Sequence, residues 1–309
     1  MSAEILAASE RKERRETDFI LCDPCVLSRP TILSASGAAR ARMLSRRGEP
    51  LFLADWMRVL MVHFEVDTGA LQRDVPYALD LRDGRAFVSL VAFTMANMRP
   101  RLGGKLGAWL CRPIATHHFL NVRTYVRHGG EPGIHFLAEW LSSRLAAALG
   151  PATFGLPYRF GKINYLHDFS SGELVGSVDG AGETFSYRAD LEIGAPFAPC
   201  VSGSLDEWLM ERYTAFNCVG GGRKFFRIWH PPWPQCAVEV ELRDVSLLRR
   251  NWPWFSGARL VSANCSPGLR GVWMGRPLGL GQPAGQGGRP LLIFRLRGFG
   301  VVGSPDLED

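Results

Sequence analysis

The strongest constraint on the fold of this chain is a ten-residue segment, residues 117–126, in which two kinds of side chain alternate. Successive side chains of an extended strand point to opposite faces, so residues two apart share a face. One face is apolar and mostly β-branched, and it consists of Leu120, Val122, Thr124 and Val126. The other face carries an amide, a guanidinium and a phenol, from Asn121, Arg123 and Tyr125. Either the polar face meets water, or it lines a polar cavity inside a β-rich fold.

The sequence around this segment predicts a hairpin and two helices. A Gly/Pro-rich turn at residues 128–133 predicts a hairpin whose second strand covers residues 134–137. Apolar residues on one side then predict a helix over residues 139–149, which the following Gly-Pro pair ends. A capping box that begins at Ser204 predicts a second helix extending to about Phe216.

Further strands are expected on both sides of these elements. Residues 51–64 are apolar and aromatic, and the long apolar run over residues 85–98 is typical of a strand buried on both faces. Alternating residues in 173–193 and 237–245 predict strands that are wet on one side, and residues 225–229 predict another strand. Many strands with two main helices predict an α+β domain with a large, mainly antiparallel sheet or barrel.

The domain organisation follows from composition along the chain. Residues 1–48 mix charged and small residues without an apolar period, which predicts a disordered N-terminal extension, with Met43 as an alternative first residue. Residues 49–280 carry the predicted elements and form one domain. Residues 281–309 follow as a Gly-rich linker and a C-terminal tail.

The charge pattern limits the expected partners. The chain has 36 Lys and Arg residues against 30 Asp and Glu residues, a formal net charge of +6. A nucleic-acid partner needs basic residues clustered on one element, whereas these are scattered among acids. No run of eighteen apolar residues is present, and the first thirty residues lack the apolar stretch of a secretory signal. We therefore expect a cytoplasmic protein with no nucleic-acid partner and no membrane partner.

Motifs for metals and cofactors are missing from the sequence. Seven cysteines without regular spacing predict free thiols. No histidine pair has metal-ligand spacing, and no P-loop, nucleophile elbow or dinucleotide fingerprint is present. The sequence therefore predicts no metal and no cofactor, and it leaves open whether the chain forms a homo-oligomer.

Five short motifs occur in an order that resembles a known family. They are residues 121–126, 132–134, 155–158, 211–213 and 230–234. Together they resemble the family called domain of unknown function 2071, the YqjF-like proteins, over residues 51–278. The resemblance implies the fold of the acetoacetate decarboxylase-like superfamily, a mostly antiparallel β-barrel or half-barrel that encloses a polar cavity, with two main helices packed outside. It implies no particular reaction.

The resemblance also identifies a missing lysine. Relatives with decarboxylase activity use a lysine that follows a Gly-x-Pro segment and forms a Schiff base with a β-keto acid. Here the residue after Gly155-Leu156-Pro157 is Tyr158. Lys162 lies four residues further on, which on a strand is the same face but over about 10 Å away. Lys162 is thus the candidate catalytic nucleophile if Schiff-base chemistry persists.

Arg123 is the strongest candidate for ligand binding. A mid-strand arginine flanked on its face by Asn121 and Tyr125 can bind a carboxylate or another planar anion through two parallel hydrogen bonds. The alternative is a structural ion pair with a carboxylate such as Glu139 or Glu211.

The remaining candidates have structural alternatives as well. Tyr158, Arg212 and His63 complete the expected ligand-binding set, although Arg212 could instead tie a helix to the sheet and His63 could be a core residue. His230 precedes two prolines, so it either shuttles protons as a catalytic residue or fixes the end of a strand.

Three functions are compatible with these residues. The leading hypothesis is a protein that binds, and either leaves unchanged or transforms, a small organic anion or carbonyl compound in a barrel cavity without a Schiff-base lysine. The first alternative is a β-keto acid decarboxylase or aldolase-type lyase that uses Lys162. The second is a non-catalytic structural or partner-binding protein.

Overall fold

The computed structural model describes residues 34–219 and 222–280, and it is dominated by one curled sheet. Residues 1–33 of the predicted extension over 1–48, and the predicted linker and tail over 281–309, lie outside the described residues. The sheet has eleven strands: β1 (Phe52–Val66), β2 (Ala78–Leu79), β3 (Ala86–Pro100), β4 (His117–His128), β5 (Glu131–Leu141), β6 (Tyr158–Phe160), β10 (Thr214–Val219), β11 (Gly222–Trp229), β12 (Cys236–Ala237), β14 (Arg259–Met274) and β15 (Leu278–Gly279).

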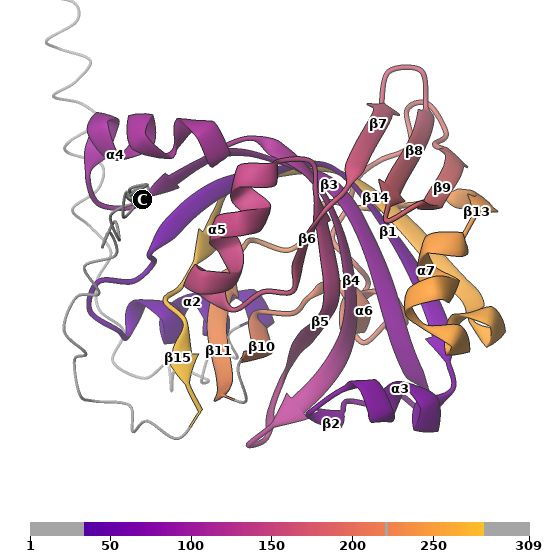
Figure 1. Ribbon diagram of the computed structural model, residues 1–309, viewed down its shortest axis with the longest axis horizontal. Coiled ribbons are helices and arrows are strands. Elements are labelled where there is room, and N and C mark those ends of the chain that lie inside the picture. The colour runs from indigo at the N-terminus through magenta and orange to yellow at the C-terminus, as the bar shows by residue number, and fades with distance from the viewer. Residues whose placement is uncertain (1–33, 220–221, 281–309) are drawn as a thin grey trace, which may run out of the picture.

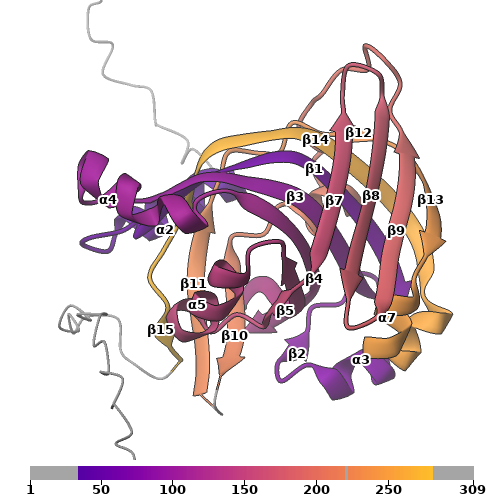
Figure 2. The ribbon, with the colours of Figure 1, turned by 45° about the horizontal axis from the view of Figure 1, so that its top comes forward.

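The sheet curls round until its ends meet, as Figures 1 and 2 show. The main order is β12-β14-β1-β3-β4-β5-β10-β11-β15, and β11 also pairs with β14 at Ile228–Met274 and Trp229–Trp273, so the strands form a ring. All pairings in this sheet are antiparallel except β5 with β6 and β5 with β10. The predicted α+β architecture with a large, mainly antiparallel sheet is therefore confirmed.

A second sheet and several helices cover the ring. The second sheet has the order β13-β9-β8-β7 and consists of β7 (Lys162–Asp168), β8 (Glu173–Gly180), β9 (Glu183–Asp190) and β13 (Glu239–Asp244). It lies over the outer face of the main sheet (Figure 2). The helices are α2 (Ala35–Leu44), α3 (Thr68–Asp74), α4 (Gly104–Cys111), α5 (Arg144–Phe154), α6 (Leu205–Met210) and α7 (Ser246–Asn251), with 3-10 turns at Arg112–Ile114 and Pro253–Gly257. No helix among the described residues is long and apolar enough to cross a membrane.

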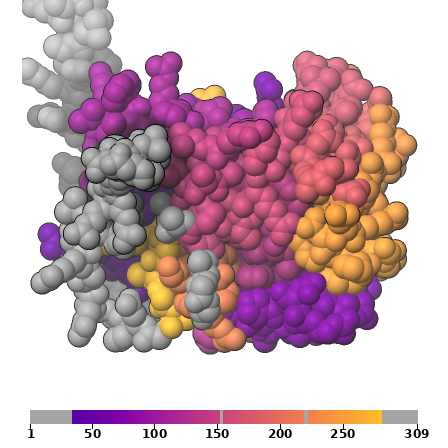
Figure 3. Space-filling model, in the orientation of Figure 1, coloured from indigo at the N-terminus to yellow at the C-terminus, as the bar shows by residue number. Residues whose placement is uncertain are grey.

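Side chains on the two faces of β4 belong to two different hydrophobic cores. Leu120, Val122 and Val126 belong to the core between the ring and the second sheet. The opposite face points into the ring, where Phe119 and Tyr125 belong to the second core. Both faces are buried, because one is covered by the second sheet and the other is enclosed by the ring. In the space-filling view, side chains close the gaps between the ribbons at α5 and the second sheet (Figure 3).

The two predicted helices have different bounds in the structure. The residues predicted to open the first helix, 139–141, instead continue β5, because this strand pairs with β4 from His128 to Phe119. Helix α5 begins at Arg144 and runs past Pro151 to Phe154. The second predicted helix ends at Met210, and residues 214–219 form strand β10 against β11. Short apolar runs are compatible with either helix or strand, and the long-range pairing decides between them.

The predicted disordered extension over residues 1–48 is wrong for its last part. Residues 35–44 form α2, whose first turn is capped by Ser34: its Oγ accepts a hydrogen bond from the Gly37 amide at 3.1 Å. Ser36 donates a hydrogen bond to the carbonyl of His230 at 2.6 Å, and Arg40 lies 5.5 Å from the ring of Trp229. Helix α2 is therefore docked on the end of β11.

This docking predicts a large cost for one side chain of α2. Met43 is 1% exposed, so Met43→Ala should lower the free energy of unfolding by about 2–5 kcal/mol through lost burial and a cavity. The neighbouring Leu44 is 46% exposed, and Leu44→Ala should change it by less than about 0.5 kcal/mol. Chemical denaturation of the two variants measures the difference. Small and equal effects would contradict the docking of α2 and support a disordered N-terminal extension.

Candidate functional site

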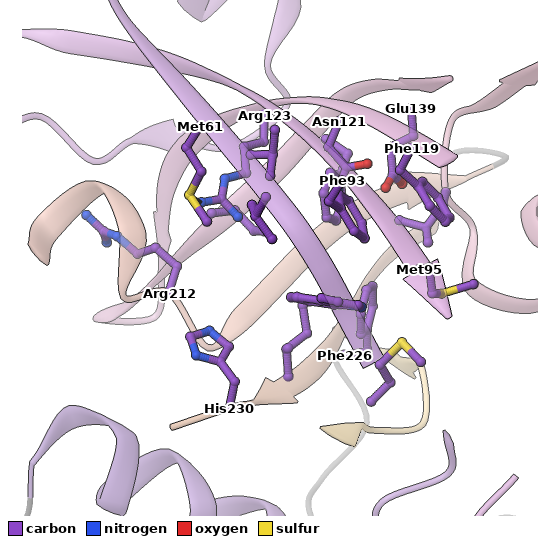
Figure 4. Close-up of a pocket in the computed structure, with 18 of the residues that line it drawn as sticks. Met61, Phe93, Met95, Phe119, Asn121, Arg123, Glu139, Arg212, Phe226 and His230 are labelled. Atoms are coloured by element: carbon purple, nitrogen blue, oxygen red, sulfur yellow. Dashed lines mark hydrogen bonds between the residues drawn. The ribbon is translucent and has the colours of Figure 1, made fainter. Parts of the chain in front are cut away.

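Three polar side chains form a row across neighbouring strands inside the ring. Asn121 of β4 is directly paired with Glu139 of β5, and Glu139 is paired with Tyr158 of β6. Neighbouring strands lie about 4.8 Å apart, so each member of the row is next to the following one. Arg123 lies two residues along β4 from Asn121. In Figure 4, Asn121 lies between Arg123 and Glu139.

The row lines an internal cavity with mostly apolar walls. The space open to the centres of water-sized molecules is about 60 Å³. At roughly 10–15 Å³ for each water, this space holds a few waters or one small organic molecule. Other polar groups at the cavity come from Arg212 and His230. The apolar part of the wall includes Trp56, Met61, Phe93, Phe119, Phe136, Leu156, Phe226, Ile228 and Trp233.

Arg123 is a buried cation without a carboxylate partner. Its side chain is 7% exposed, and no carboxylate oxygen of the described residues lies within 4.0 Å of its guanidinium. One nitrogen donates to the Leu209 carbonyl at 3.4 Å and lies 3.9 Å from the Met61 sulfur. Its Nε has no hydrogen-bond partner in the described chain. The expected alternative, an ion pair with Glu139 or Glu211, is therefore not formed.

Glu139 is a buried carboxyl group that opens onto the same cavity. It is 3% exposed, and within the described ranges its Oε2 has no hydrogen-bond partner. Burial raises the pKa of Glu139 well above its usual value, and the attraction of Arg123 opposes this effect without cancelling it. Glu139 therefore favours its neutral acid form, in which the carboxyl group can donate a hydrogen bond.

Tyr158 occupies the position after Gly155-Leu156-Pro157, at the edge of the cavity beside Glu139. Burial raises the pKa of Tyr158, and the neighbouring Glu139 raises it further, so the phenol keeps its proton. Gly150 of α5 permits this placement, because a Cβ atom there would lie 2.0 Å from the tyrosine ring.

The hydrogen bond of His230 determines its tautomer. Its Nδ1 lies 2.7 Å from the carbonyl oxygen of Pro231, and a carbonyl can only accept, so Nδ1 carries the proton. Nε2 is then left with a free lone pair. Burial lowers the pKa of His230 to about 4, which keeps the ring neutral at pH 7. His230 is 2% exposed and packs against Tyr213 and Trp233.

Arg212 has the structural role that the sequence left open. One of its terminal nitrogens lies 2.7 Å from Asp80, and its Nε donates to the Trp208 carbonyl at 2.7 Å. The guanidinium also lies 4.1 Å from the Trp208 ring centre. It therefore ties the end of α6 to the sheet, although its other terminal nitrogen has no partner in residues 34–219 and 222–280 and the side chain contributes to the cavity wall.

Three predicted site residues do not line the cavity. Tyr125 points into the ring as predicted, but its hydroxyl donates to the Leu209 carbonyl at 2.9 Å and also contacts Ser89. Ser89 in turn lies 2.6 Å from Nδ1 of His63, which is completely buried. Lys162 lies on β7 of the second sheet with an exposed side chain. Tyr125, Ser89 and His63 thus form a buried hydrogen-bonded chain, and Lys162 is not among the residues that line the cavity.

Sequence reasoning missed Glu139 as a site residue, because it placed this residue in a helix. The hairpin held only part of the signal: extending the pairing of residues 123–126 would place Ala138 opposite Asn121, and a register shift between Val122 and Arg123 brings Glu139 there instead. No cluster of three or more His, Cys, Asp or Glu side chains in the described part of the chain could hold a metal ion.

Comparison with known proteins gives the family of this chain. The model of domain of unknown function 2071, described as an uncharacterized conserved protein, matches residues 53–259. The chain belongs to this family. The uncharacterized protein YqjF of Bacillus subtilis is 31% identical over 189 residues, which is 60% of this chain and 76% of YqjF.

Solved structures with the same fold include two enzymes, both too distant in sequence to indicate more than the fold. The enduracididine biosynthesis enzyme MppR, complexed with a condensation product of pyruvate and imidazole 4-carboxaldehyde, is 13% identical with a TM-score of 0.54, covering 74% of this chain and 89% of MppR. The acetoacetate decarboxylase of Legionella pneumophila is 12% identical with a TM-score of 0.52, covering 74% of this chain and 87% of the decarboxylase.

The buried histidines predict that stability falls in mild acid. Burial lowers the pKa of six histidines: to about 3 for His63, to about 4 for His117, His167 and His230, and below the usual value for His118 and His135. At pH 7 both the folded and the unfolded chain hold these rings neutral. As the pH falls below 6.5, the unfolded chain binds protons that the folded chain does not, so the free energy of unfolding decreases between pH 6.5 and 4.

A single variant tests the predicted fall of the free energy of unfolding in mild acid. His63→Gln should reduce the slope of the free energy of unfolding against pH by roughly 1.4 kcal/mol per pH unit near pH 5, because one proton no longer distinguishes the two states. Glu139 and Glu211, whose pKa values are raised by burial, act in the opposite direction, but they are two groups against six. Urea denaturation at several pH values gives the slopes. An unchanged slope in the variant would contradict the buried neutral state of His63.

Proposed function

We propose that the cavity binds a small organic anion that also carries a carbonyl group, a short oxo acid, with its carboxylate on Arg123. The supporting observation is the buried guanidinium of Arg123 without a carboxylate partner among the described residues. A buried charge is costly unless it is paired. A bound carboxylate would supply the missing partner and could accept two parallel hydrogen bonds from the fork.

The rest of the cavity suits the carbonyl end of the same molecule. The polar row beside Arg123 offers an amide, a protonated carboxyl and a phenol, while the apolar wall excludes water from the bound molecule. The small volume favours a ligand of a few heavy atoms. The related fold of MppR has been solved with pyruvate, at a TM-score of 0.52 and 14% identity. Pyruvate is accordingly the first probe to use.

Binding of pyruvate should depend on the charge and the shape of residue 123. Arg123→Met should weaken binding at least about tenfold, and Arg123→Lys should restore only part of it, because an ammonium group cannot reproduce the planar fork. Arg188→Met, at an exposed ion pair on the second sheet, is the matched control and should bind like the wild type. Ligand-observed NMR titration measures all four proteins. No binding by the wild-type protein, or equal binding by Arg123→Met, would refute the proposal.

The proposed site acts without a Schiff-base lysine. Lys162 is exposed on the second sheet, and Tyr158 stands where decarboxylase relatives carry their lysine. Reduction with borohydride in the presence of acetoacetate or pyruvate should therefore leave the mass of the protein unchanged. Intact-mass spectrometry makes the measurement, and an adduct mapped to Lys162 would instead support the lyase alternative.

A further inference from the structure

The cavity places two neutral hydrogen-bond donors side by side. Glu139 and Tyr158 are paired residues of parallel strands β5 and β6, and both line the cavity. Oε2 of Glu139 has no partner in the described structure, so its capacity to hydrogen-bond is unused. The Tyr158 ring is held in place by Phe119, at a centroid distance of 5.9 Å, and by Gly150. Such a pair can donate two hydrogen bonds to one oxygen atom.

This arrangement suits the formation of an enolate. When a carbonyl compound loses a proton from the neighbouring carbon, negative charge develops on the carbonyl oxygen. A Schiff-base lysine stabilises that charge by replacing the oxygen with a protonated nitrogen. Hydrogen-bond donors held in place in a site with little water also stabilise the negative charge on the oxygen. A carboxylic acid that an apolar site keeps protonated is an effective donor of this kind.

The opposite wall supplies a base. Because Nδ1 of His230 donates to the Pro231 carbonyl, its Nε2 lone pair is free, and the residue lines the same cavity as Glu139 (Figure 4). A neutral imidazole can accept a proton from carbon. Helix α2 holds the backbone of this histidine through the hydrogen bond from Ser36. The base therefore comes from a rigid strand end.

We propose that Glu139, in its acid form, and Tyr158 are catalytic residues that donate to the carbonyl oxygen of a short 2-oxo acid, while Nε2 of His230 removes a proton from C3. The inference rests on the proposed binding of the carboxylate at Arg123. The C3–H bond breaks and its proton passes to His230. Its electron pair forms the C2–C3 double bond, and the carbonyl π pair moves to the oxygen. The protonated His230 exchanges this proton with solvent and returns one to C3, while the electron pair on the oxygen re-forms the carbonyl; this restores the oxo acid and the neutral imidazole, so no oxidant, reductant or co-reactant is needed.

Proton exchange in deuterated water tests this activity. The wild-type protein should accelerate replacement of the pyruvate methyl protons by deuterium at least about a hundredfold over buffer alone, measured by proton NMR. Tyr158→Phe, Glu139→Leu and His230→Asn should each lower this rate at least about a hundredfold. Tyr158→Phe and Glu139→Leu should weaken pyruvate binding by a smaller factor than they lower the exchange rate, because Arg123 still binds the carboxylate. Glu173→Gln, on the second sheet, is the control and should exchange normally.

The pH profile separates catalysis from a structural role for Glu139. The charged and titratable groups that line the cavity with it are Arg123, Tyr158, Arg212 and His230. The wild-type rate should fall as Glu139 loses its proton in alkaline solution, because the carboxylate then repels the enolate oxygen. Glu139→Gln keeps a donor that does not titrate, so its rate should stay within about tenfold of the wild type and lack this fall.

The possible outcomes are distinct. Failure of the wild-type protein to bind pyruvate refutes the proposed function, and with it the inference. Binding without exchange refutes only the inference. Normal exchange by Glu139→Leu, or an alkaline fall that persists unchanged in Glu139→Gln, also overturns the role of Glu139. If Glu139→Leu does not fold, the profile of Glu139→Gln still decides.

Discussion

Burial of the Arg123 guanidinium inside the ring is the constraint on which the arrangement of the site depends. A cation that is 7% exposed would normally be paired with a carboxylate, yet the nearest candidates among the described residues are held elsewhere or kept neutral. Asp80 binds Arg212, and Glu211 accepts hydrogen bonds from the Trp233 amide and the Tyr213 hydroxyl. Glu139 favours its acid form because burial outweighs the attraction of Arg123. The structure therefore keeps positive potential in the cavity instead of neutralising it, which is the condition for attracting an anion.

The fold maintains this condition by burying strand β4 on both faces. The outer face joins the core beneath the second sheet, and this core fixes the strand in register with β3 and β5. The inner face is then free to carry polar groups, because its position does not depend on their own packing. The chain through Tyr125, Ser89 and His63 ends on the Leu209 carbonyl, to which Arg123 also donates. Rigid surroundings of this kind can hold polar groups that lack partners, which a mobile loop could not.

Local pattern predicted the inner wall of the site, and long-range contacts determined the rest. Period two placed Asn121 and Arg123 on one face, since the pleat of a strand determines this without reference to other elements, but it left open whether that face is buried. The same rule places Tyr125 on the inner face. It gives no information on the hydrogen bond that the Tyr125 hydroxyl donates to the Leu209 carbonyl, 84 positions away in the sequence. Glu139 was assigned to a helix because apolar spacing near Trp140 fits both structures, and only pairing with β4 selects the strand. Helix α2 was missed for a similar reason: its contacts with β11 lie about 190 residues away in the sequence.

A tyrosine where decarboxylase relatives carry a lysine changes what the cavity can do with a carbonyl compound. A lysine there must lose its proton to attack, and its positive charge would compete with Arg123 for the anion. A phenol whose pKa is raised by burial remains neutral and adds no charge, so all of the positive potential stays on the Arg123 side. The carbonyl end of a bound oxo acid would then meet neutral donors, and its carboxylate end would meet the cation. This separation would orient such a ligand without a covalent bond, so a tyrosine at position 158 is consistent with a buried arginine that has no carboxylate partner among the described residues.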